Sequence, residues 1–109
     1  MQVIDNAQVR KFRMPGLTQQ TLAGLESGMK SFEVWLTSLE PGSETPPHRH
    51  HGEVVWLILR GSGRIVVDGK EVEVGPDTTV VIPPGASRHL VNTGKEDLVM
   101  FNIRTMIAA

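Results

Sequence analysis

The chain has 109 residues, a length typical of one domain. Its net charge of −1 and its pI of about 6.4 show no charge excess typical of a nucleic-acid or membrane-surface partner. It contains no cysteine, which excludes disulfide scaffolds, thiolate metal sites and thiol nucleophiles. No apolar segment approaches the roughly 20 residues of a membrane span, and the start, MQVIDNAQVRKF, lacks the apolar core of a signal peptide. We therefore expect a soluble, cytoplasmic protein.

Glycine or proline recurs every few residues between short β-branched runs, a pattern typical of an all-β domain. Asp68-Gly69 separates two strand-like runs and predicts a two-residue type I′ hairpin. Pro83-Pro84-Gly85 ends another run, because proline cannot donate to a central ladder. Seven or eight short strands predict a sandwich or a small barrel. The expected strands cover residues 17–22, 32–39, 54–59, 64–67, 70–74, 78–82 and 98–103.

The segment PPHRHHGEVVWLILRG, residues 46–61, holds three of the four histidines. His48 and His50 are two residues apart, so on a strand both point to one face and form a clamp for a divalent metal. Glu53 adds a carboxylate oxygen, and His89 completes a three-histidine site if a second strand brings it opposite. Such a site leaves open positions for water, dioxygen or substrate. The competing interpretation is that histidines near a loop are merely solvated. His51 fits this interpretation, because on a strand it would point to the opposite face from His48 and His50.

These residues resemble the two conserved motifs of the cupin superfamily. The first motif, G-x5-H-x-H-x3-4-E-x6-G, is matched by residues 42–61, with His48 and His50 at the family spacing. The second, G-x5-P-x-G-x2-H-x3-N, is matched around Pro83-Pro84-Gly85, His89 and Asn92. The resemblance extends over residues 32–103.

The resemblance implies a cupin double-stranded β-helix, a jelly-roll barrel, as the single domain of residues 1–109. Residues 32–103 are the expected barrel core, and residues 1–31 an N-terminal segment with an edge strand. The resemblance also implies a small-molecule ligand, a homodimer, and a divalent metal ion (Mn, Fe, Ni or Zn). The metal ligands that it implies are His48, His50, Glu53 and His89.

The sequence departs from the family pattern at two of these ligands. An ungapped reading places Val54 at the position of the family glutamate and Arg88 at that of the family histidine. A shift of one residue reverses the face to which a strand side chain points. Bulges near Val54 and before Asn92 would turn Glu53 and His89 inward again. Without bulges, Val54 and Arg88 enter the pocket, and a guanidinium there favours an anion such as a carboxylate.

Trp56 shares the parity of Val54 and is expected to pack in the core or to form an aromatic wall of the pocket. The leading hypothesis is a small metal-binding cupin, with an enzymatic role of the oxygenase, isomerase or lyase type left open. A non-catalytic binding or sensor module is the first alternative. A metal-free cupin that binds an acid through Arg88 is the second.

Overall fold

The computed structural model describes residues 1–106, which form ten strands and two short 3-10 helices. Helix η1 covers Asn6–Gln8 and helix η2 covers Leu25–Ser27. The strands are β1 Phe12–Met14, β2 Leu17–Ala23, β3 Phe32–Leu39, β4 His48–Arg49, β5 Val54–Arg60, β6 Gly63–Val67, β7 Lys70–Val74, β8 Thr78–Ile82, β9 Ser87–Asn92 and β10 Leu98–Thr105.

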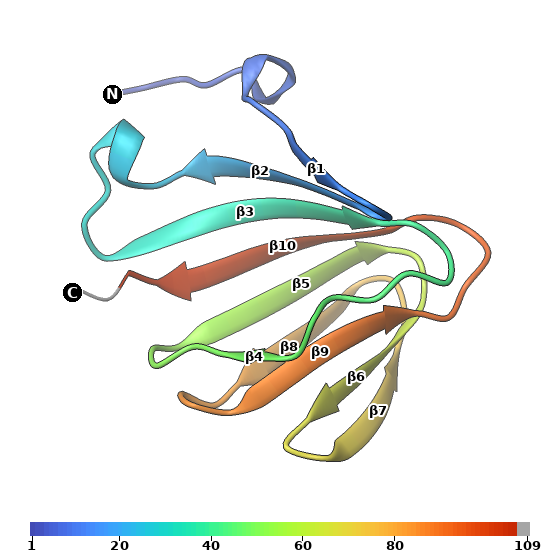
Figure 1. Cartoon of the computed structure of the whole chain (residues 1–109). Coiled ribbons are helices and arrows are strands. Elements are labelled where there is room, and N and C mark those ends of the chain that lie inside the picture. The colour runs from blue at the N-terminus through green and yellow to red at the C-terminus, as the bar shows by residue number, and fades with distance from the viewer. Residues whose placement is uncertain (107–109) are drawn as a thin grey trace.

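The strands form two antiparallel sheets that face each other (Figure 1). The larger sheet has the order β1-β2-β3-β10-β5-β8 and the smaller one the order β4-β9-β6-β7. Connections repeatedly cross from one sheet to the other, which is the jelly-roll arrangement expected from the sequence. The predicted all-β barrel is therefore confirmed.

Side chains alternate between the inside of the barrel and its surface, so each strand contributes every second residue to the core. On β5 the inner residues are Val54, Trp56 and Ile58, each at most 2% exposed. Facing them from β9 is Leu90, which is fully buried. Burial of one such side chain contributes about 1.5–3 kcal/mol relative to exposure. The remaining core residues are Leu17, Leu39, Ile65, Ile82, Ala86, Leu98 and Met100.

Two turns show how the sequence fixes the sheet ends. Asp68 and Gly69 both have positive φ, 46° and 83°, as the predicted type I′ hairpin between β6 and β7 requires. Gly61, between β5 and β6, has a φ of 85°, and a Cβ there would lie 2.7 Å from the Leu98 Cα. Glycine at position 61 therefore permits both the turn and the close approach of β10.

The predicted strands correspond to β2, β3, β5, β6, β7, β8 and β10, and β3, β7 and β8 have the predicted bounds. Strands β1 and β9 were not predicted, and β4 is a two-residue strand that carries the His48 end of the histidine cluster. In the described part of the chain, no helix has the length and apolar character needed to cross a membrane.

Candidate functional site

Arg88 lies in the interior of the barrel. Buried and partly buried positions alternate along β9. The buried ones are Arg88, Leu90 and Asn92, and the partly buried ones are Ser87, His89 and Val91. Arg88 is 1% exposed, although arginine is almost never fully buried unless it is paired. The alternation of β9 therefore puts a cation at a core position.

Arg88 has no hydrogen-bond partner for Nε, Nη1 or Nη2 anywhere in residues 1–106. Burial lowers the pKa of this guanidinium, and the nearby positive charge of Arg104 lowers it further. The group nevertheless stays charged, because an arginine begins so far above neutral pH. An unpaired buried charge is costly, so this arrangement favours an anion beside Arg88.

Arg104, by contrast, has a counter-ion and further partners. Its Nε lies 3.3 Å from Oε1 of Glu33, as an ion pair without the alignment of a hydrogen bond. Its guanidinium carbon lies 4.3 Å from the ring centre of Trp35, a cation–π contact. Nη2 donates to His50 Nδ1 at 2.7 Å. Glu33 thus balances the positive charge of Arg104, whereas Arg88 has no counter-ion among residues 1–106.

The partners of His50 determine its tautomer. Nδ1 accepts from Arg104, so the proton must lie on Nε2, which donates to the Thr105 carbonyl at 2.8 Å. Burial lowers the pKa of His50, the Thr105 carbonyl raises it, and the charges of Arg104 and Arg88 lower it again, for a net decrease. His50 is therefore a neutral side chain at pH 7, with both ring nitrogens occupied by protein groups.

Further polar atoms without partners lie on the inner face of the larger sheet. Asn102 is paired across the ladder with Trp35 on one side and with Trp56 on the other. Within the described residues, the indole Nε1 atoms of both tryptophans and Oδ1 of Asn102 are buried without a hydrogen-bond partner. Two N–H donors and the guanidinium of Arg88 thus face the barrel interior, an excess of donors that suits a ligand rich in acceptor oxygens.

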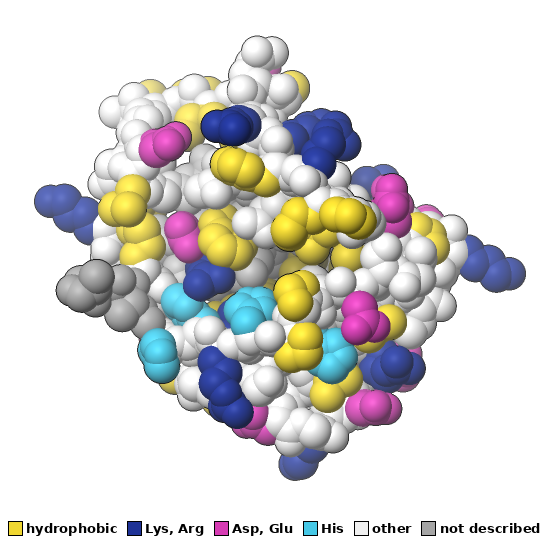
Figure 2. Space-filling model, in the orientation of Figure 1, with side chains coloured by type: hydrophobic (Ala, Val, Ile, Leu, Met, Phe, Trp, Pro, Cys, Tyr) yellow, Lys and Arg dark blue, Asp and Glu magenta, His cyan; other side chains and the backbone are white. Residues whose placement is uncertain are grey.

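The predicted metal ligands are not brought together. His48 is exposed, with Nδ1 3.1 Å from the Pro46 carbonyl, and lies across the ladder from Arg88. Glu53 is exposed at the start of β5, and its carbonyl accepts from the Thr105 backbone. His89 lies on the opposite face of β9 from Arg88 and pairs with Val66. On the face shown in Figure 2, the histidines lie in one region with basic and hydrophobic side chains between them.

The bulges that would turn Glu53 and His89 inward are not formed. β5 pairs with β8 in unbroken register over Val54–Ile58, and β9 pairs with β6 in unbroken register over 88–92. The chain follows the ungapped alternative, in which Val54 and Arg88 point inward. A bulge leaves ladder groups unpaired, and here the regular ladder keeps them paired.

A divalent ion does not fit the donors as they are placed. A metal centre needs several donors converging on one point, and no three His, Cys, Asp or Glu side chains of residues 1–106 are grouped so as to hold an ion. His50 uses both ring nitrogens on protein partners, and the cations Arg88 and Arg104 lie nearby, where like charge opposes a metal ion. The four-ligand metal site stays a prediction.

Sequence reasoning missed Arg104, Glu33 and Asn102. The prediction ended the last strand at residue 103, one residue before Arg104. A signal was nonetheless present: Asn102 and Arg104 share the parity of Leu98 and Met100, which are buried. Polar residues that continue the buried face of a strand toward its end are a typical feature of a pocket in a barrel mouth.

Comparison with known proteins agrees with this architecture. The family model for the cupin domain matches residues 35–104. Auxin-binding protein 1 of Arabidopsis thaliana is 42% identical over 94 residues, which cover 77% of this chain and 48% of that protein. Auxin-binding protein T85 of Nicotiana tabacum is 37% identical over 95 residues, 76% of this chain and 51% of that protein. The chain spans about half the length of these relatives.

Two solved structures are similar over almost the whole chain. The polyketide cyclase RemF from Streptomyces resistomycificus is 26% identical, with a TM-score of 0.83 over 96% of this chain and 79% of that one. A predicted oxalate decarboxylase from Thermotoga maritima is 25% identical, with a TM-score of 0.84 over 97% of this chain and 100% of that one. With the family match and the jelly-roll topology, these similarities show that the chain belongs to the cupin family.

Proposed function

We propose that this protein binds a small carboxylate inside its barrel through Arg88. The observation that supports the proposal is a fully buried guanidinium whose three nitrogens have no partner among residues 1–106. A carboxylate fits this group because its two oxygens can accept two parallel N–H bonds from one guanidinium. The buried charge is then neutralised where water is excluded, so the ion pair is strong.

The surroundings of Arg88 favour a ligand with a single negative charge. Arg104 already has Glu33 as its counter-ion, so the site offers one unbalanced positive charge rather than two. The indole N–H groups of Trp35 and Trp56 add neutral donors that a carbonyl or hydroxyl oxygen of the ligand can occupy. A monocarboxylate satisfies these groups better than a neutral molecule or a dianion.

The relatives support a small organic ligand. Two of them are named as auxin-binding proteins, and the similar solved structures include a polyketide cyclase. The present chain differs from the cupin motif where Val54 and Arg88 replace the family glutamate and histidine. We therefore infer that recognition of the acid depends on a guanidinium. A catalytic role would show as turnover of a bound acid, which the same ligands can test.

The test is binding of matched acids and amides, measured by isothermal titration calorimetry and thermal shift. Acetate, benzoate and indole-3-acetate are compared with acetamide, benzamide and indole-3-acetamide, which have nearly the same shape and no charge. We expect at least one acid to bind and to raise Tm, its amide to bind at least tenfold more weakly, and Arg88→Met to abolish binding. The exposed Arg60→Met is the matched control. Equal binding by acid and amide, or full binding by Arg88→Met, would contradict the proposal.

Metal analysis decides the competing prediction. Protein reconstituted with Mn, Fe, Ni or Zn is assayed by mass spectrometry beside a His48→Ala/His50→Ala variant. Near-stoichiometric metal that the variant loses would support the metal-binding cupin predicted from the sequence and would count against the free guanidinium as the principal site. Metal far below one ion per chain would support binding by Arg88 alone.

The predicted homodimer also has a surface that suits it. On the outer face of the larger sheet, Leu36 of β3, Phe101 of β10 and Leu57 of β5 are neighbours across the ladder. Two residues further along the same face, Val55 of β5 pairs with Val81 of β8, which is 74% exposed. A contiguous apolar sheet face of this kind favours a second copy of the chain. Light scattering should give a dimer mass for the wild type and a monomer mass for Leu57→Glu.

A further inference from the structure

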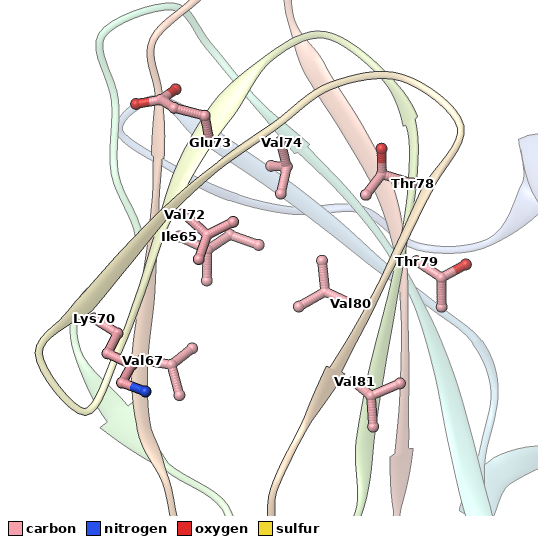
Figure 3. A pocket seen from close by; sticks show the side chains of 10 residues that line it. All are labelled: Ile65, Val67, Lys70, Val72, Glu73, Val74, Thr78, Thr79, Val80 and Val81. Atoms are coloured by element: carbon pink, nitrogen blue, oxygen red, sulfur yellow. The ribbon is translucent and has the colours of Figure 1, made fainter.

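A cavity of about 400 Å³ lies between the hairpin β6–β7 and strand β8. It opens between β7, which is an edge of the smaller sheet, and β8, which is an edge of the larger one. Figure 3 shows Val80 of β8 pointing across this gap toward Ile65 and Val72 of the hairpin. The lining is mainly branched and apolar, with Ile65, Val67, Val72, Val74 and Val80 on its walls and Lys70 at one end.

The inner wall of this cavity adjoins the residues of the candidate site. Val67 on β6 is the ladder partner of Arg88 on β9, so the two side chains are neighbours on the same face. On the opposite wall, Val80 of β8 is the ladder partner of Trp56 on β5. Arg88 and Trp56 do not themselves line the cavity, but a ladder partner of each does, so the cavity lies directly beside the part of the barrel interior that holds Arg88 and Trp56.

The charges at the cavity define an orientation. Lys70 lies at the end beside Val67, which is its own partner in the hairpin and the neighbour of Arg88. Glu73 lies toward the other end, but its carboxylate points away from the valines (Figure 3), and its ladder partner is Arg64. A carboxylate is therefore attracted to the Lys70 and Arg88 end. An apolar group is favoured along the valines between the two ends.

We propose that this cavity holds the apolar body of the ligand, so that the ligand is a monocarboxylic acid with an aliphatic or aromatic tail. The carboxylate pairs with Arg88, and the tail lies between β7 and β8. The exposed Val72 marks the opening. A volume of this size is at the lower end of the range found for small-molecule pockets. The inference rests on the proposed carboxylate site and adds the chemical class of its ligand.

Affinity as a function of tail length tests the inference. Acetate, butanoate, hexanoate and octanoate are titrated against the wild type by calorimetry. Burial of each methylene in an apolar cavity should tighten binding about fourfold until the cavity is filled. The double variant Val72→Thr/Val80→Thr keeps β-branched shapes while it makes both walls polar, so the gain per methylene should fall to about twofold or less. Val55→Thr, on the outer face of β5, is the matched control and should keep the wild-type dependence.

Val72→Trp provides a second, independent variant. Val72 is 59% exposed, so a larger side chain is tolerated there without disturbing the core, and it obstructs the cavity opening. We expect octanoate to lose at least tenfold in affinity while acetate keeps its wild-type affinity. A tail-length dependence that both variants leave unchanged would overturn this inference and leave the Arg88 proposal standing. Absence of binding by every acid would instead contradict the Arg88 proposal itself.

Discussion

Arg104 donates a hydrogen bond from Nη2 to Nδ1 of His50 at 2.7 Å, which fixes His50 as the neutral tautomer with its proton on Nε2. A proton added to Nδ1 would face the guanidinium N–H, so protonation of His50 breaks this contact and places two cations together. The pKa of His50 is accordingly below the ordinary value of 6.5, first because the ring is partly buried and then because Arg104 and Arg88 are nearby.

The lowered pKa predicts how stability depends on pH. Between pH 6.5 and the folded-state pKa of His50, the unfolded chain binds a proton that the folded chain does not, so stability decreases as pH falls through this window. Above pH 6.5 the contribution of His50 is fully present. Urea unfolding at a series of pH values should show this decrease in the wild type and a smaller one in His50→Gln, which keeps an acceptor for Arg104. His51→Gln, at an exposed neighbour, should behave as wild type; equal slopes in all three proteins would show that His50 is not responsible.

The buried charge of Arg88 is expected to lower the stability of the free protein, although acid binding requires it. In the free protein its guanidinium is buried without a partner in the described chain, which costs free energy, and Met offers a similar length without a charge. We expect Arg88→Met to raise the free energy of unfolding by about 1–3 kcal/mol. Saturating acid should stabilise the wild type but not this variant. Denaturant unfolding with and without the acid measures both effects, and a loss of stability in Arg88→Met would mean that the guanidinium has a structural role.

Substitution of Asn92 is expected to affect stability but not acid binding. Its Nδ2 donates to the carbonyls of Leu39 and Glu96 at 2.8 and 2.9 Å, and its Oδ1 accepts from the Gly94 backbone at 2.9 Å. Asn92 thus joins the end of β3 to the loop between β9 and β10. Asn92→Ala leaves the buried Leu39 carbonyl unsatisfied, so we expect a loss of about 2–4 kcal/mol in stability with unchanged acid affinity. Thr93→Ala is the exposed control; a loss of affinity at full folding would contradict a structural role.

The sequence was informative where alternation and turn chemistry agreed. Strand β7 and the Asp68-Gly69 turn follow directly from residue types, because a two-residue hairpin with positive φ at both positions needs such residues. Strand β9 was missed because its pattern is inverted. A charged residue is expected on the surface, yet Arg88 is buried and His89 on the other face is partly exposed. The buried charge on β9 therefore conflicts with the usual pattern of a buried strand face, unless a ligand balances the charge of Arg88.

The candidate site was only partly predictable for a related reason. The spacing of His48 and His50 identifies the motif, but whether Glu53 or Val54 points inward depends on the register of β5, which β8 and β10 determine. Arg104 reaches His50 and Glu33 across strands that are far apart in the sequence. Such contacts depend on sheet register, and a single sequence does not contain that information.

The registers of β5 and β9 indicate which two substitutions should create a metal site in this barrel. Val54 and Arg88 occupy the inward positions at which the cupin pattern has its glutamate and second-motif histidine, and His48 and His50 keep the pattern's spacing. In a Val54→Glu/Arg88→His variant the buried cation is removed and two metal donors point inward, so we expect about one divalent ion per chain by mass spectrometry, well above the wild type.

Controls separate this prediction from the four-ligand site that the sequence first suggested. Val54→Glu alone should not bind metal, because the buried cation Arg88, which the double variant removes, is still present and opposes a metal ion. Glu53→Gln and His89→Gln, made in the double variant, should leave its metal content unchanged, since both side chains lie outside the barrel. Metal loss on either substitution would mean that the chain can shift its register to bring these donors inward, and the family ligands would then be Glu53 and His89 after all.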